Sequence, residues 1–97
     1  MASRIRVTAA ASAINNATDW LQLRGAPRNF FDVSISGSFS ATMVLERKRP
    51  GEADGSARTV LPYTAPAEEI AEMAGHWDVR LRMTAFTSGT ATLELGV

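Results

Sequence analysis

Apolar and polar residues alternate along two stretches of the chain, residues 31–45 and 77–97. Alternation with a period of two is typical of a β-strand that buries one face and exposes the other. Each stretch contains a triplet with a glycine, Ser36-Gly37-Ser38 in the first and Thr87-Ser88-Gly89 in the second. Because glycine readily takes the positive φ that a three-residue hairpin loop requires, we predict that each stretch forms a β-hairpin closed by its triplet.

The hydrophobic pattern also predicts the register within each hairpin, because a slip of one residue would move apolar side chains to the exposed face. In the second hairpin, Met83 would then pair with Leu93. The same register places Arg82 opposite Glu94 on the exposed face, where opposite charges stabilise a strand pair. Hydrophobicity and charge therefore indicate the same register.

The remaining segments give shorter signals. Three further strands are predicted at residues 4–8, 20–24 and 58–63. Residues 48–56 form a polar segment with Pro-Gly and Asp-Gly pairs, which is typical of a loop. Residues 67–74 lie between Pro66 and Gly75 and have the composition of one or two helical turns.

These elements predict an all-β fold, a small antiparallel β-sandwich or jelly-roll-like domain with one short helical turn. A chain of 97 residues fits one domain with one thin core. Within it, we expect residues 1–29 to form an N-terminal arm and the first short strands. Residues 30–97 would form the β-sandwich itself.

Composition excludes several classes of function. The chain has 10 basic and 10 acidic side chains, whereas nucleic-acid-binding domains usually carry a surplus of Lys and Arg. The absence of cysteine excludes a disulfide scaffold, a Cys-ligated zinc site and a thiol nucleophile. No segment approaches the roughly 18 consecutive apolar residues of a membrane-spanning helix. We therefore expect neither a nucleic acid nor a membrane as partner.

Residues suited to catalysis or metal binding are few. The single histidine, His76, has no nucleophile or carboxylate partner that the sequence identifies. Glu68, Glu69 and Glu72 cluster on the predicted helical turn, where acidic side chains complement the helix dipole. We therefore expect no catalytic residue, no cofactor and no metal, and we predict that the protein is not an enzyme.

Five residues are candidates for contact with a partner. Trp20, Phe30 and Phe86 are out of phase with the apolar positions of their strands, so their rings would lie on nominally exposed faces. Either a second layer of the fold or a partner covers them. Arg47 and Arg49 belong to the one basic run of the chain and would supply charges at the rim of a contact.

Several motifs resemble small structural proteins of tailed bacteriophages. Residues 33–47, VSISGSFSATMVLER, resemble the VSGTF-x-x-TVTLQR core of that family, and residues 63–66 resemble its YTAP segment. Residues 77–82 and 87–91 resemble its W-x-x-R-L-R and TSGT ending. Phe86 stands where the family commonly has Tyr, and the loop at residues 48–56 differs in length and content.

The resemblance implies a component of the virion. The first expectation is a capsid decoration (cement) protein on the capsid surface, present in the host cytoplasm during assembly, which binds the major capsid protein or another virion protein and stabilises the head. The alternative is a tail- or head-fibre-associated module that binds a host surface glycan or another virion protein. The resemblance is also compatible with a homo-oligomer of this chain, and a trimer would suit a three-fold capsid site. The alanine-rich residues 1–18 could then act as an arm that reaches a neighbour.

Overall fold

The computed structural model describes residues 6–25 and 27–97, and these residues form six antiparallel strands. The strands are β1 (Arg6–Ala11), β2 (Leu21–Leu23), β3 (Arg28–Lys48), β4 (Arg58–Tyr63), β5 (Ala67–Ala74) and β6 (Trp77–Gly96). One 3-10 turn, η1 (Asp54–Ser56), lies in the loop between β3 and β4. The expectation of a small all-β antiparallel domain is confirmed.

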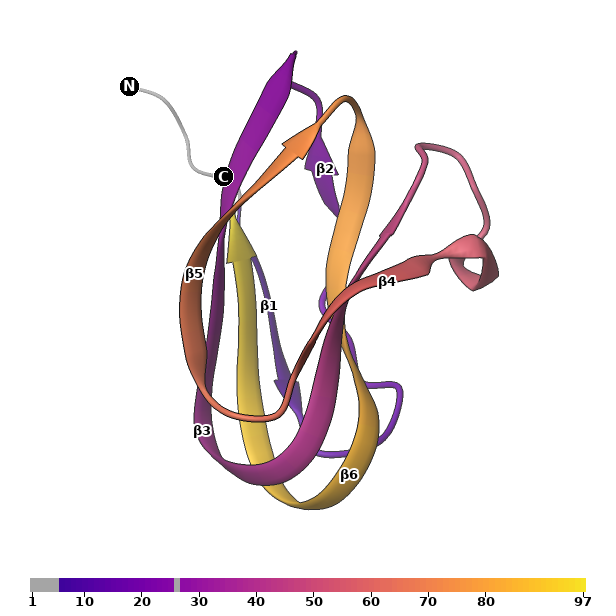
Figure 1. Ribbon diagram of the computed structural model, residues 1–97. Coiled ribbons are helices and arrows are strands. Elements are labelled where there is room, and N and C mark those ends of the chain that lie inside the picture. The colour runs from indigo at the N-terminus through magenta and orange to yellow at the C-terminus, as the bar shows by residue number, and fades with distance from the viewer. Residues whose placement is uncertain (1–5, 26) are drawn as a thin grey trace.

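The two longest strands, β3 and β6, pair with each other along most of their length and organise the fold. They run side by side down the molecule, curve together at the bottom of the view and return on the other side (Figure 1). The paired ribbon therefore contributes to two layers. In the first layer β1 and β5 flank the ribbon, and in the second layer β2 and β4 flank it.

The two predicted hairpins are wrong, because neither stretch turns back on itself. Residues 36–38 and 87–89 continue through β3 and β6, and Gly37 and Gly89 lie in the curved part of the ribbon. Both glycines have positive φ, 109° and 88°. A Cβ atom on Gly89 would collide with the carbonyl oxygen of Ser38 on the neighbouring strand. The glycines therefore allow two strands to bend together rather than one strand to reverse.

Two register shifts lie in the same curved part, between Ser40 and Ala41 and between Thr42 and Met43. Each leaves one extra residue on β6, which is a β-bulge. Bulges increase the local bend and twist of a strand pair. Together with the glycines, they turn the ribbon from one layer into the other.

The predicted pairs within the second hairpin change accordingly. Met83 pairs with a residue of β3 rather than with β6 itself. Arg82 donates a hydrogen bond to Glu46 on β3, and Glu94 binds Arg6 on β1. The Arg82–Glu94 pair is therefore wrong, although each side chain does find an opposite charge on a neighbouring strand.

The helical turn predicted at residues 67–74 is also wrong, because this segment is β5. All eight residues pair with β3, including Ala71 opposite Phe31 and Met73 opposite Asn29. The pairing satisfies the backbone of β5, and its inner side packs Ala71 and Met73 against the core. Helix propensity of Ala, Glu and Met is a weak preference that such packing overrides.

The buried apolar side chains of both layers form a single core. It comprises Ala11, Leu21, Leu23, Phe31, Val33, Ile35, Met43, Leu45, Tyr63, Met73, Trp77, Val79, Leu81, Met83, Ala91, Leu93 and Leu95. These residues occupy alternate positions of the strands, as the period-two pattern predicts. The outward positions of each layer are therefore the surfaces available for function.

The N-terminal segment belongs to the sheet where it is described. β1 pairs with β6 from Arg6 to Ala11, and Ala11 is fully buried. Residues 6–11 are therefore a strand of the domain rather than an arm. Residues 1–5, which include the start of the predicted 4–8 strand, lie outside the described residues. The strands predicted at residues 20–24 and 58–63 correspond to β2 and β4.

Candidate functional site

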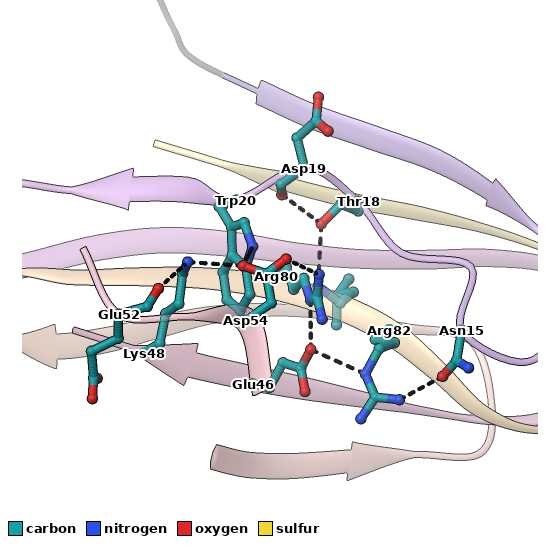
Figure 2. Close-up of polar contacts among 11 residues, drawn as sticks. Asn15, Thr18, Asp19, Trp20, Glu46, Lys48, Glu52, Asp54, Arg80 and Arg82 are labelled. Carbon is teal, nitrogen blue, oxygen red and sulfur yellow. Dashed lines mark hydrogen bonds and ion pairs between the residues drawn. The ribbon is translucent and has the colours of Figure 1, made fainter. Parts of the chain in front are cut away.

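Trp20 lies on the outer face of the second layer, in the cluster of polar contacts shown in Figure 2. Lys48 Nζ lies 4.7 Å from the centroid of its ring, and Arg80 Cζ lies 4.3 Å from it. The indole N–H donates a hydrogen bond of 3.1 Å to Asp54. The half-buried indole is therefore held by residues of its own chain.

Glu46 is the centre of this charged cluster, with its side chain only 4% exposed. It accepts hydrogen bonds from Arg80 Nε at 2.5 Å and from Arg82 Nε at 3.1 Å. Arg82 also donates to Asn15, and Arg80 lies 3.6 Å from Asp54 (Figure 2). A buried carboxylate is tolerated when it is paired and hydrogen-bonded in this way.

Asp54 links the loop between β3 and β4 to the same cluster. It accepts a hydrogen bond of 2.9 Å from Lys48 Nζ, and Lys48 also donates to the carbonyl of Glu52. The hydrogen bond from Lys48, helped by nearby Arg80 and Trp20, lowers the pKa of Asp54. Because these charges are already satisfied by one another, the cluster fastens the loop onto the sheet and leaves few groups for a ligand.

Arg47 and Arg49 lie at the end of the core, against Trp77. Their guanidinium carbons are 4.1 Å and 3.8 Å from the centroid of the Trp77 ring. The Trp77 indole donates to the carbonyl of Ala74, which ties β6 to the end of β5. Arg47 is half-buried and Arg49 is exposed, so the pair covers the end of the core while one of the two remains accessible.

Phe86 lies in the curved part of the ribbon and is half-buried. It packs against the core with Phe39 and Ala41, with which it lines a shallow hollow. Its position opposite Ala41 on β3 accounts for its being out of phase with the neighbouring apolar residues, because the bulges shift the alternation there.

Phe30 is the most exposed of the predicted contact residues. It lies on the outer face of the first layer, where 61% of its surface is accessible. Ile70, a diagonal neighbour on β5, is 81% exposed, and Val97 beside them is 37% exposed. These three side chains, here called the apolar patch, line a shallow hollow between the start of β3, the middle of β5 and the end of β6.

Ile70 was missed from the sequence because its segment was interpreted as a helical turn. Once residues 67–74 are taken as a strand with Ala71 and Met73 inside, Ile70 must point outward. The local pattern could not have identified it, because the apolar residues 67, 70, 71 and 74 match the helical period. Only the pairing of this segment with β3 shows which way Ile70 points.

Ion pairs border the apolar patch. Arg6 crosses β6 to bind Asp32 at 2.9 Å and Glu94 at 2.8 Å. The hydrogen bond from Arg6 lowers the pKa of Glu94, and the two carboxylates raise the pKa of Arg6. On the β5 side, Glu72 Oε1 lies 3.5 Å from Arg28 Nη1. The patch is therefore an apolar surface inside a polar border, which is the usual anatomy of a protein–protein contact.

Other kinds of site find no support in the part of the chain that the structure describes. Within residues 6–25 and 27–97, no three His, Asp or Glu side chains are grouped so that they could hold a metal ion. His76 is exposed in the turn between β5 and β6. Among the same residues, no helix is long and apolar enough to cross a bilayer.

The fold and its surfaces define a small antiparallel β-sandwich with an exposed apolar patch. The chain matches no protein-family model, and the searches of curated proteins and of solved structures each returned no significant match.

Proposed function

We propose that the protein is a structural component of a bacteriophage virion, a capsid decoration protein that binds and stabilises the assembled head. The resemblance of its strand motifs to small phage structural proteins supports this proposal. The observation that carries it is the exposure of Phe30 and Ile70 side by side on one outer face. Two large apolar side chains exposed together are typical of a surface that a protein partner covers.

The size of the patch is consistent with attachment by many weak contacts. Burial of one Phe or Ile side chain contributes about 1.5–3 kcal/mol. Association also costs free energy for lost rigid-body motion, so one small patch gives a weak contact. A capsid presents the same contact site many times, and an oligomer of the decoration protein that engages several sites gains affinity through effective concentration.

The alternative, a tail or fibre module that binds glycan, depends on an available aromatic platform. The ring of Trp20 contacts Lys48 and Arg80, and its N–H is used by Asp54. A sugar would have to displace one of these cations from the ring. The apolar patch needs no such rearrangement, and this difference favours a protein partner.

The first experiment locates the chain in purified particles of its phage by cryo-electron microscopy and quantitative gel densitometry. Hundreds of copies over the shell are the expected result. A few copies at one vertex or along the tail would instead support the alternative, and complete absence from particles would refute the proposal.

The second experiment tests the patch by adding purified protein to undecorated heads. The double variant Phe30→Ser/Ile70→Ser should bind far more weakly than the wild type. The control variant Ile14→Ser removes another large apolar side chain, 56% exposed, from outside the patch. Equal loss of binding in both variants would show that the patch is not the contact.

A further inference from the structure

The sheet has four strands with a free edge, and they differ in what they offer to a partner. Among the described residues, β1, β2, β4 and β5 each pair on one side only. β2 has three residues, and β4 contains Pro62 and a register shift. Short strands, prolines and bulges all discourage pairing with another chain. β1 is longer, but beyond Arg6 its side chains are small and neutral.

β5 is the longest of these edges and has a distinctive pattern of side chains. Glu68, Ile70 and Glu72 alternate along its outer face, and all three are exposed. Glu68 accepts a hydrogen bond of 2.9 Å from Ser34, and Glu72 forms an exposed ion pair with Arg28 that an incoming basic side chain could share. Glu69 points to the opposite face, where it accepts a hydrogen bond from Tyr63. The outer row of this edge therefore reads acidic, apolar, acidic.

The last two residues of β5 are engaged by side chains of their own chain. The carbonyl of Met73 accepts a hydrogen bond from Asn29, and the carbonyl of Ala74 accepts one from Trp77. Residues 67–72 remain as the open part. In an antiparallel ladder, alternate residues direct N–H and C=O groups away from the paired neighbour, so this segment presents backbone groups to an incoming strand.

We infer that the open edge of β5 binds an extended strand of another protein whose outward side chains read basic, apolar, basic. Backbone hydrogen bonds would extend the first layer by one strand, as in other cases of β-strand addition. A basic side chain would lie beside Glu68 and another beside Glu72, with an apolar side chain on Ile70. Because the row has the same order in both directions, the required pattern does not depend on the direction of the added strand.

Charge disfavours a second copy of β5 as the occupant. Antiparallel pairing of two such edges centred on Ile70 would place Glu68 of one copy opposite Glu72 of the other. Like charges directly opposite each other destabilise a strand pair. The acidic row thus disfavours self-association while it admits a basic strand, which is how interfaces gain specificity.

This inference rests on the proposed function in that the added strand is taken to belong to the virion partner. It can nevertheless be tested on the isolated protein. The probe is the heptapeptide TKTITKT, titrated into ¹⁵N-labelled protein at up to millimolar concentration. Saturable shifts of the backbone amides of residues 67–72 are expected, and the matched peptide TETITET should bind about tenfold more weakly.

Single variants test the charges separately from the backbone edge. Glu68→Gln and Glu72→Gln should each weaken binding of the lysine peptide. Asp19→Asn, which removes an exposed acidic side chain from outside β5, should leave it unchanged. Equal affinity for both peptides, or shifts located elsewhere, would overturn the inference, as would the absence of any saturable shift.

Binding to heads separates this inference from the proposed function. If attachment depends on Phe30 and Ile70 but is indifferent to Glu68→Gln and Glu72→Gln, the decoration role stands and the inferred strand is wrong. If the lysine peptide binds β5 but the protein is absent from particles, the edge is a real binding site and the virion role is wrong.

Discussion

The guanidinium group of Arg6 lies directly over Gly96, so close that a Cβ atom at the glycine would collide with it. Because Gly96 has no side chain, there is space for the Arg6 side chain to cross β6. On the far side, Arg6 binds Asp32 of β3. A glycine at the end of β6 thus allows the Arg6 side chain to connect β1 to β3 across β6.

We predict that Gly96→Ala breaks this bridge. The displacement of the arginine and the loss of its ion pairs should lower the free energy of unfolding modestly, because exposed ion pairs contribute little. Gly55→Ala is the matched control, because no atom lies within 4 Å of its added Cβ. Urea denaturation measures both variants. If the two are equally stable, the close approach of Arg6 does not matter.

Gly89→Ala should destabilise the protein much more, because the residue has a positive φ and its Cβ would collide with the backbone of β3. Gly51 also has a positive φ but has open space around it. Gly51→Ala should therefore show only the backbone cost of about 1–2 kcal/mol. In thermal denaturation, a larger loss of stability for Gly89→Ala than for Gly51→Ala would measure the cost of the collision. An equal loss of stability in the two variants would show that the collision is unimportant.

The only tyrosine of the chain provides a direct test of the core near β5. Burial, and then the hydrogen bond to Glu69, raise the pKa of Tyr63 from 10.0 to about 12. The absorbance of tyrosinate should therefore rise with a midpoint near 12 in the folded protein and near 10 in denaturant. A midpoint of 10 under native conditions would show that the hydroxyl is exposed.

The same shift predicts a loss of stability at high pH. The folded state holds the Tyr63 proton more tightly than the unfolded state does. The stabilisation that protonated Tyr63 gives to the folded state is therefore complete below pH 10 and is lost as the pH rises through about 12. Tyr63→Phe should remove this component of the pH dependence. Other groups also titrate in this range, so the quantity to compare is the difference between wild type and variant.

At low pH, the loop between β3 and β4 should loosen. The pKa of Asp54 is lowered by its hydrogen bond from Lys48, so the interaction is present above pH 3.8 and is lost as the pH falls through the lower folded value. Wild type should therefore be more stable than Asp54→Asn at neutral pH, with the difference vanishing in acid. Trp20 fluorescence can follow the loop, since its indole binds Asp54.

Deletion of residues 1–18 tests whether the N-terminal segment acts as a strand of the domain or as an arm. The arm interpretation predicts a folded domain with weakened attachment. In the structure, this deletion removes β1 and the backbone hydrogen bonds that Asn15 and Thr18 make with β6. We therefore expect a large loss of stability, seen as loss of the cooperative thermal transition. A fully stable deletion variant would restore the arm interpretation.

The sequence predicted which side chains face inward but not which strand each one meets. Ile35 and Leu93 are both core residues, as their alternation indicates, and they pair with each other across β3 and β6. A hairpin and a long-range ribbon keep the same residues on the same face, so the period-two pattern cannot distinguish them. The glycine triplets could not distinguish the two either, because a residue with positive φ can form part of a hairpin turn or of a bend in a continuous strand.

The contact residues show a similar limit. Phe30 could be identified because it breaks the alternation of its own strand. Trp20 breaks it too, yet it is half-buried by Lys48, Arg80 and a loop that is remote in sequence. The position of a residue in the alternation predicts which face of the strand its side chain lies on. Whether another segment of the chain covers that face depends on the tertiary structure.

The shared ribbon of β3 and β6 also affects how the protein reaches this structure. Every other strand attaches to β3 or β6, and these two pair across separations from 30 residues, at Lys48 and Asp78, to 64, at Asp32 and Gly96. Among the described strands, only the pairing of β4 with β3, which starts at Arg47 and Arg58, is local in sequence. Folding of such topologies is slow because distant segments must meet first. During synthesis, the first layer cannot close until the ribosome has released residue 96, because β1 and the start of β3 pair with residues 91–96.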